Sequence, residues 1–266
     1  MNDIYFEKCG QCAHGELVRD NHDEFYLCKV HKSPTQCDGD KVAVRSVKLI
    51  AHTPNPMAVI EKAASMCYNS KPTNSGRIAK SCYNSGHTSV FEHATFTFEI
   101  TGVSRAFLAQ ITRHRIASFS VRSQRYCVEE GFKSVWPTEF INNPLMATLY
   151  ERALENSQYA YDLLREIGAE PEDARSVLPN ACETCMVVTM NARELMSFCG
   201  LRLCTRAQLE IRQVAQMMVE CVREVAPDIA EFLRPNCERY APYNFCTERE
   251  SCGRHPTLAE VFEKRE

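Results

Sequence analysis

The segment Ala94–Thr101 alternates apolar and polar side chains without interruption. Phe96, Phe98 and Ile100 occupy one side of the segment, whereas threonines and a glutamate occupy the other. A period of two is the pattern of a β-strand that buries one face and keeps the other polar. We therefore expect a sheet that packs its apolar face against other elements of the fold.

Two more strands are expected, one at Ser46–Ala51, where Val47, Leu49 and Ala51 share a face, and one at Met186–Met190. Apolar residues at helical spacing, prolines at first helical positions and a terminal glycine predict the helices. These are expected from Asn55-Pro56 to about Tyr68, over Gly76–Asn84, from Val103 through Phe107 and Leu108 to Ile111, from Asn143-Pro144 to near Gly168, over Pro171–Val177, over Ala192–Leu203 and over Arg206–Val225.

The order of these elements limits the fold class. Strands come first and most helices come later, which is typical of an α+β domain rather than of a doubly wound sheet. No G-x-G-x-x-G follows a predicted strand, so a Rossmann nucleotide site is not expected. We predict a small, mostly antiparallel sheet packed against a helical layer, with a short N-terminal metal-binding module.

Charge and hydropathy exclude some classes of partner. The 266 residues carry a net charge of −3, which predicts no general attraction to a nucleic-acid backbone. No apolar run approaches the ~18 residues that a membrane span needs. The N-terminus lacks the basic and then apolar pattern of a signal peptide. We expect a cytoplasmic protein with no nucleic-acid or membrane partner.

Fifteen cysteines need an explanation, and an odd number without an export signal argues against a disulfide scaffold. Residues 1–42 are polar and contain Cys9, Cys12, Cys28 and either Cys37 or His31 at the spacing of a small zinc site. A polar segment of this length lacks a core, so a structural zinc ion would explain how it folds. An iron–sulfur cluster and plain reduced thiols are the alternatives.

We divide the chain into a Cys/His-rich module at 1–42, a main domain at 43–240 and a tail at 241–266. Cys237, Cys246, Cys252 and His255 have a spacing compatible with zinc, although unrelated thiols would give the same spacing. The remaining cysteines are interpreted as packing residues, because free cysteine is often buried. They are Cys67, Cys82, Cys127, Cys182, Cys185, Cys199, Cys204 and Cys221.

The densest group of chemically useful side chains lies at residues 113–126, which read RHRIASFSVRSQRY. Four arginines, one histidine and three serines occupy this stretch. Guanidinium groups are permanently charged forks of donors that suit phosphates and the edges of uracil or flavin rings. A solvated basic face at a helix end is the alternative, but the apolar residues between the charges favour a segment that is half buried in a site.

This stretch resembles the signature of the flavin-dependent thymidylate synthases, R-H-R followed by seven residues and a serine, here Arg113–Arg115 and Ser123. Further matching blocks occur in the same order as in that family. They are Gly86-His87 with Phe91–His93, Leu178–Thr184, Val188–Arg193 and Arg206–Arg212, so that the resemblance covers about residues 46–235. The chain departs from frequent family residues at Ser120, Val121, Ser197 and Leu209.

The resemblance implies an enzyme that methylates dUMP to dTMP. In that family 5,10-methylenetetrahydrofolate donates the carbon, NADPH is the reductant and FAD is the redox carrier. No cysteine nucleophile is used. An arginine polarises the uracil ring, which is electrostatic activation by a fixed cation in a dry site. The resemblance also implies a homotetramer whose active sites are shared between subunits.

Residue roles follow from the positions that match the family. Arg202 matches the activating arginine, and Ser123 matches a serine once proposed as nucleophile, for which we favour a positioning role. The dUMP-binding positions are Gln110, Arg113, Ser123, Gln124, Arg125, Arg175 and Arg202, and the FAD-binding positions are Ser89, Arg113, His114, Arg115, Val121, Asn191, Arg193 and Ser197. A zinc-containing, nucleic-acid-binding regulator and a flavin reductase without methyl transfer are the rival hypotheses.

Overall fold

The computed structural model describes residues 15–20, 23–28, 42–67, 69, 71–72, 75–239 and 243–263. The chain forms two compact units. The first comprises the described residues up to Arg45 with Gly102–Leu108 and Val121–Cys185, and the second comprises Ser46–Thr101, Ala109–Ser120 and the described residues from Met186 onward. The domain limits that we placed after residues 42 and 240 stay a prediction.

Near the N-terminus, β1 (Gly15–Asp20) and β2 (Asp23–Cys28) form a two-stranded antiparallel sheet, in which Gly15 pairs with Cys28. We predicted a metal-binding module for residues 1–42 and did not predict these two strands. Apart from the backbone of Cys28, the predicted metal ligands lie outside the described residues; they are Cys9, Cys12, Cys37 and the alternative His31.

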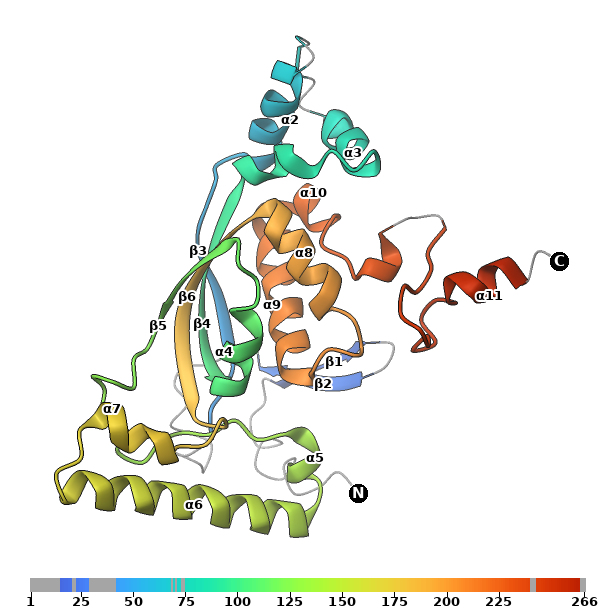
Figure 1. Cartoon of the computed structure of the whole chain (residues 1–266). Coiled ribbons are helices and arrows are strands. Elements are labelled where there is room, and N and C mark those ends of the chain that lie inside the picture. Colours follow the sequence, from blue (N-terminus) through green and yellow to red (C-terminus); the bar gives the residue numbers. More distant parts are fainter. Residues whose placement is uncertain are drawn as a thin grey trace. The chain divides into compact units, whose positions relative to one another are not determined.

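The main sheet has four strands in the order β3-β4-β6-β5 (Figure 1). They are β3 (Ser46–His52), β4 (Thr95–Ser104), β5 (Ala117–Val121) and β6 (Glu183–Asn191). β3 and β4 pair antiparallel, with Ser46 opposite Thr101. The alternation that predicted β4 is confirmed, because Phe96, Phe98 and Ile100 are fully buried.

Helices α8 (Ala192–Arg202) and α9 (Leu209–Val225) form the layer beside this sheet (Figure 1). α9 packs against β3 and buries Ile211, Val214 and Met218. In the sheet, alternate residues of β6 are buried together with the aromatic side of β4. The predicted α+β architecture, a small sheet packed against helices, is therefore confirmed.

In the described part of the chain, the remaining helices include the predicted segments near residues 56–68, 76–84, 143–168 and 171–177, together with five short helices that were not predicted. In the second unit they are α2 (Pro56–Cys67), α3 (Arg77–Asn84), η2 (Thr88–His93), α10 (Pro227–Ala230), η4 (Asn236–Glu238) and α11 (Leu258–Glu263); in the first they are α5 (Thr138–Ile141), α6 (Pro144–Glu166), α7 (Pro171–Ala174) and η3 (Arg175–Val177). At the start of α6, the Asn143 side chain accepts hydrogen bonds from the backbone amides of Leu145 and Met146. After its end comes Gly168, whose φ is 97°. These are the expected cap and terminating glycine.

Three details of the predicted elements are wrong. Ile50 shifts the register between β3 and β4, so Ala51 is exposed instead of sharing a face with Leu49. Val103 belongs to β4 rather than to the following helix, α4 (Arg105–Ile111). The short strand β5 was not predicted, because the arginine pattern around it suggested a site rather than a strand.

Gly102 allows β4 to pass close to the chain that precedes β3. Its φ is +68°, and a Cβ atom built on it would lie 1.9 Å from the carbonyl oxygen of Val44. A residue with a side chain would therefore be both strained and in collision with backbone. Two residues later, the Ser104 hydroxyl accepts the amide of Phe107 and caps the start of α4.

Most cysteines in the described part of the chain are fully or partly buried, as predicted, but Cys67 is exposed, so its interpretation as a packing residue is wrong. Burial raises the pKa of Cys182 to about 12 and also raises the pKa of Cys199. Neither thiol is a nucleophile near neutral pH. Within the described ranges, no helix combines the length and the apolar character needed to cross a bilayer.

Candidate functional site

Arg202 is the last residue of α8 and lies half buried beside the chain that leaves α4. Its Nε donates to Nε2 of His114 at 3.2 Å, and its Nη2 donates to the carbonyl oxygen of Gln110 at 3.2 Å. Burial lowers the pKa of Arg202, although a guanidinium stays charged at any ordinary pH. The side chain is therefore a fixed cation with a defined direction.

His114 connects Arg202 to a buried carboxylate. Its ring is 6% exposed, and its Nδ1 lies 3.0 Å from Oε1 of Glu194, which is 8% exposed. Because Nε2 accepts a hydrogen bond from Arg202, the ring proton is assigned to Nδ1, which donates to Glu194. The ring is then neutral. Its lowered pKa agrees, since burial outweighs the hydrogen bond to Glu194 and Arg202 opposes a second positive charge.

Glu194 is a site residue that our sequence analysis missed. Its position, three residues after Asn191, is that of a helix-capping partner. The Asn191 side chain does accept the Glu194 amide at 2.8 Å and caps α8. The Glu194 carboxylate, however, is directed to His114 rather than back to the cap. Because its position fits a helix cap, the sequence did not indicate that the Glu194 carboxylate orients the imidazole of His114.

Three predicted positions, Gln110, Arg113 and Arg115, lie close to His114 in the sequence. The Gln110 side chain donates to Oε1 of Gln208. Arg113 is exposed, and Arg115 is exposed as well. Neither guanidinium has a hydrogen-bond or ion-pair partner among the residues that the structure describes. Permanent charges without protein partners are suitable for binding an anionic ligand.

The predicted FAD-binding positions on η2 and α8 belong to elements that pack against each other. Ser89 on η2 and Ser197 on α8 are exposed. Arg193, also on α8, forms an ion pair with Glu92 of η2. This pair is about half exposed on both sides, so solvent screens it and a stronger anion can compete for the guanidinium.

In the first unit, two predicted arginines meet at one glutamate. Nε of Arg125 lies 2.7 Å from Oε2 of Glu172, and Nε of Arg175 donates to the Glu172 carbonyl oxygen at 3.1 Å. Both arginines are exposed. The Ser123 hydroxyl accepts the Arg125 amide at 3.2 Å, which fixes the turn between them. This cluster presents positive charge and a hydroxyl to solvent.

The other predicted positions in the first unit are less accessible. Gln124 is buried and Val121 is half buried. Arg122, next to both, has a structural role: its Nη2 lies 3.0 Å from Oε2 of the buried Glu129. Burial acts to lower the pKa of Arg122, but Glu129 and Cys127 together outweigh it and the net shift is upward. We had not assigned Arg122 to a ligand, and its buried partner agrees with that.

Among the predicted residues, the structure therefore brings together Gln110, His114 and Arg202 in the second unit and Ser123, Arg125 and Arg175 in the first. What each group can do follows from its chemistry. The second unit offers an oriented cation at Arg202 and, on either side of His114 in the sequence, two exposed guanidinium groups without partners among the described residues. The first offers two accessible guanidinium groups next to a hydroxyl, which is a phosphate-type donor set.

Comparison with known proteins gives one consistent family. The family model described as thymidylate synthase complementing protein matches residues 48–228. A flavin-dependent thymidylate synthase of Clostridium tetani is 38% identical over 245 residues, covering 81% of this chain and 96% of the relative. The enzyme of the same name from Geobacter sulfurreducens is 44% identical over 203 residues, covering 72% of this chain and 88% of the relative.

Solved structures agree with these relatives. Flavin-dependent thymidylate synthase ThyX from Helicobacter pylori, complexed with FAD and dUMP, has a TM-score of 0.60 and 25% identity, covering 71% of this chain and 99% of that one. A UMP/dUMP methylase, PolB, from Streptomyces cacaoi bound with 5-Br dUMP has a TM-score of 0.64. It is 24% identical, covers 72% of this chain and 95% of that one, and supports the fold alone.

Proposed function

Because this chain belongs to the flavin-dependent thymidylate synthase family, we propose that it converts dUMP to dTMP with 5,10-methylenetetrahydrofolate as carbon donor and NADPH as reductant through FAD. The rival regulator that binds nucleic acid finds no support, since the matched relatives are enzymes. The geometry that carries the proposal for this chain is the fixed cation at Arg202.

The chemical difficulty of the reaction is that C5 of uracil is a poor nucleophile. A cation at the N3 edge of the ring favours the ionised form of the base and moves electron density toward C5. Arg202 has five N–H donors, of which the described part of the protein uses two, and the other three can bind a ligand. Its direction is set before the ligand arrives, which is the condition for effective electrostatic stabilisation.

His114 and Glu194 support this role of Arg202. A neutral imidazole with its proton on Nδ1 offers only a lone pair to Nε of Arg202. It therefore holds the guanidinium without adding a charge that would repel it. Glu194 keeps the proton on Nδ1, as carboxylates that accept one ring N–H do when they orient a catalytic imidazole.

Binding of the nucleotide is assigned to the remaining matched positions. We propose that Arg125 and Arg175 bind the dUMP phosphate and that Ser123 orients the nucleotide rather than attacking it. Two exposed guanidinium groups close to Glu172 suit this task, because a phosphate can replace both the screened carboxylate that pairs with Arg125 and the carbonyl oxygen that accepts from Arg175. Gln110, Arg113 and Gln124 are proposed as further contacts. We also propose a homotetramer in which these residues come from more than one subunit.

The flavin positions fit an anionic dinucleotide. Arg113 and Arg115 have charges without partners in the described part of the chain, and Ser89 and Ser197 add exposed hydroxyls. We propose that these residues hold FAD together with His114, Val121, Asn191 and Arg193. When bound, FAD supplies the redox chemistry that carries electrons from NADPH.

At the N-terminus, we propose a structural zinc ion bound by Cys9, Cys12, Cys28 and Cys37, with His31 as the alternative fourth ligand. The proposal depends on the spacing of these residues and on the polar character of residues 1–42. Replacing Cys9 and Cys12 together with serine should remove about one zinc ion per chain. An unchanged metal content would contradict the assignment.

The proposed reaction is tested by flavin absorbance. The purified protein should be yellow, NADPH should bleach the flavin, and the rate or extent of this reaction should change when dUMP is added. Reoxidation with methylenetetrahydrofolate should yield dTMP in proportion to NADPH consumed. A flavin reductase would oxidise NADPH without forming dTMP, and a colourless protein that does not bind FAD would contradict the proposal.

A further inference from the structure

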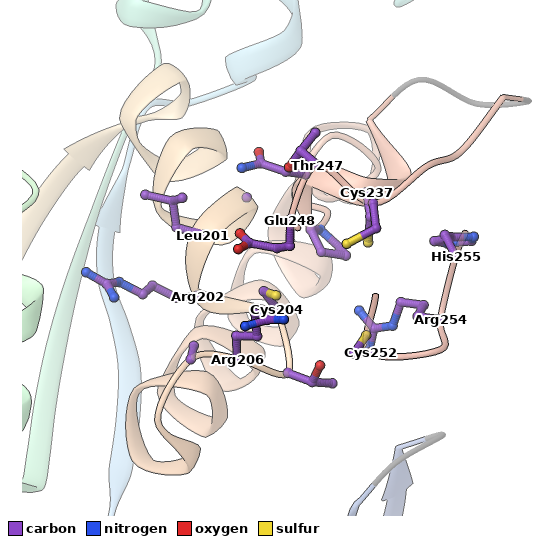
Figure 2. A pocket seen from close by; sticks show the side chains of 16 residues that line it. Leu201, Arg202, Cys204, Arg206, Cys237, Thr247, Glu248, Cys252, Arg254 and His255 are labelled. Atoms are coloured by element: carbon purple, nitrogen blue, oxygen red, sulfur yellow. The ribbon is translucent and has the colours of Figure 1, made fainter. Parts of the chain in front are cut away.

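Four thiols and one imidazole line a single cavity near the C-terminal end of the second unit. The cavity has a volume of about 200 Å³ and lies between the turn after α8, the helix η4 and the tail (Figure 2). Its metal-binding side chains are Cys204, Cys237, Cys246, Cys252 and His255. Arg202 also belongs to the lining of this cavity, but its guanidinium is directed away from Cys237 and His255 (Figure 2).

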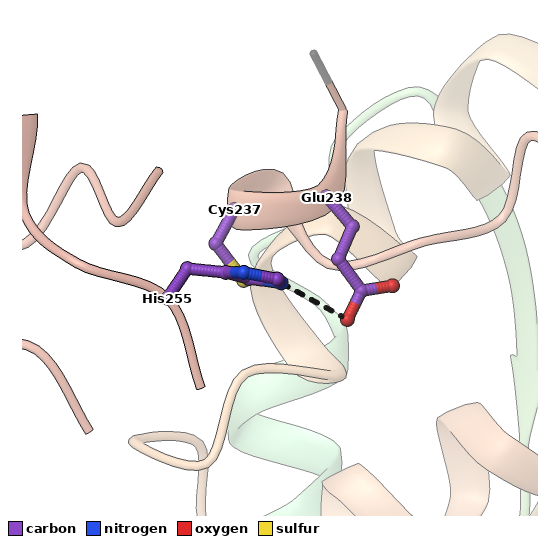
Figure 3. A group of neighbouring side chains, drawn as sticks. All are labelled: Cys237, Glu238 and His255. Carbon is purple, nitrogen blue, oxygen red and sulfur yellow. Dashed lines mark ion pairs between the residues drawn. The ribbon is translucent and has the colours of Figure 1, made fainter. Parts of the chain in front are cut away.

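Three donor groups are already close together. Single ligand atoms of Cys237, Glu238 and His255 lie within 4.8 Å of one another (Figure 3). Ligands of a tetrahedral zinc ion are about 3.3–3.8 Å apart, given bonds of about 2.0–2.3 Å. Only a small closure of these side chains is therefore needed to reach a metal-binding geometry.

Glu238 fits the role of a supporting residue. Its Oε1 lies 3.8 Å from Nε2 of His255. Metal-bound imidazoles usually donate the other ring N–H to a carboxylate, which fixes the tautomer and the ring orientation. The same oxygen lies 3.7 Å from Nη1 of Arg254, which offsets the negative charge that several thiolates would bring.

One backbone and two side-chain hydrogen bonds connect the segments that carry the other thiols. The Cys246 amide donates to the carbonyl of Pro256 at 2.7 Å, so that Cys246 runs alongside the segment that carries His255. The Arg254 side chain donates a hydrogen bond to the Leu203 carbonyl oxygen at 3.5 Å, and the Arg206 side chain donates one to the Glu250 carbonyl oxygen at 2.8 Å. These bonds connect the tail to the turn that contains Cys204.

The tail buries almost no apolar side chains, so a hydrophobic core does not explain how it folds. Among described residues 243–263, Cys246 is the single buried residue. Tyr243 and Phe262 are exposed large apolar side chains. A segment that buries so little apolar surface needs another source of stability, and a structural metal is a common one in small thiol-rich segments.

Gly200 brings η4 close to α8. A Cβ atom at Gly200 would lie 2.3 Å from Oδ1 of Asn236, the residue that precedes Cys237. The absence of a side chain there lets the Cys237 segment approach the end of α8. This contact places the Cys237 thiol at the wall of the cavity instead of further out in solvent.

We propose that Cys237 and His255 bind a structural zinc ion and that two of the thiols of Cys204, Cys246 and Cys252 complete its tetrahedral shell. Thiolate and imidazole are the ligands that structural zinc prefers, and four protein ligands leave no open position. The site fastens the C-terminal tail to the end of α8. It takes no part in the methylation chemistry, so it stands or fails independently of the proposed function.

The test is the zinc content of full-length protein by elemental mass spectrometry. A Cys9→Ser/Cys12→Ser background excludes metal held by the N-terminal module. In this background we expect about one zinc ion per chain, which Cys237→Ser and His255→Gln should each reduce by more than half. Cys67→Ser, which removes an exposed thiol outside the cavity, is the matched control and should leave zinc unchanged.

Single serine variants of Cys204, Cys246 and Cys252 then identify the other ligands, and two of the three should lose zinc. A second measurement covers variants that fold poorly. In the intact background protein, bound metal should shield the cavity thiols from alkylation until a chelator is added, as peptide mapping would show. Zinc content that Cys237→Ser and His255→Gln leave unchanged, or cavity thiols that react equally with and without chelator, would overturn the proposal.

Discussion

Replacing Glu194 with alanine tests how Arg202 is held. The carboxylate accepts the Nδ1 proton of His114 at 3.0 Å in a buried setting. Without it, the Nδ1 proton has no acceptor, so the tautomer and the orientation of the ring are no longer fixed, and in the other tautomer an Nε2–H would face Nε–H of Arg202, donor against donor. Arg202 would lose its acceptor and its fixed direction.

The size of this effect follows from the bonds involved. A hydrogen bond to a charged group contributes about 1.5–3 kcal/mol, and about 1.4 kcal/mol corresponds to a factor of ten. Glu194→Ala should therefore lower kcat/KM for dUMP by about 10- to 100-fold. FAD content and the rate of flavin reduction by NADPH should change much less, because neither depends on polarising the uracil.

Glu194→Gln is the matched control, since its amide oxygen can still accept the Nδ1 proton. We expect it to retain most of the activity that alanine loses. The assay is the initial rate of dTMP formation at varied dUMP, on variants whose melting temperatures show that they are folded. An alanine variant within twofold of wild type, or a glutamine variant as inactive as alanine, would refute the relay through His114.

Three further predictions concern acidity and stability. Burial lowers the pKa of His114 from its ordinary 6.5, so the unfolded chain takes up a proton at a higher pH than the folded protein does. The stability that this group contributes is present above pH 6.5 and is lost as the pH falls through the pKa of the folded state. Melting temperatures from pH 8 to pH 5 should therefore show a step that His114→Asn removes. Gly102→Ala should destabilise the fold by several kcal/mol, because its Cβ would meet the Val44 carbonyl at 1.9 Å, and urea unfolding would measure it. Phe98→Ala should cost about 3–5 kcal/mol in the same assay, since the ring is fully buried, and a loss below about 1 kcal/mol would contradict that packing.

Much of the fold could be predicted because periodic patterns are local. Phe96, Phe98 and Ile100 identified a strand, and Asn143 with Gly168 marked the ends of a long helix, as the structure confirms. The failures occurred where tertiary contacts decide. Val103 fits a helical spacing, yet it continues β4 because Gly102 allows the strand to pass the preceding chain.

The candidate site shows the same division. A charged segment around Arg113 could be recognised from residue types alone. The bond between Arg202 and His114 joins residues 88 positions apart, and no spacing rule predicts it. Glu194 was hidden by its position as a capping residue, although its carboxylate serves the imidazole. Residue types predict which chemistry is available, whereas packing determines which side chains meet.

The central claim is that the Arg202 cation activates C5 of uracil. Because methylation replaces the hydrogen at C5, release of tritium from C5-labelled dUMP measures this step directly. Arg202→Ala should retain bound FAD and its reduction by NADPH while tritium release falls by at least 100-fold. Arg223→Ala, which removes an exposed arginine on α9, should behave like wild type. Tritium release by Arg202→Ala at a near-normal rate would contradict the account.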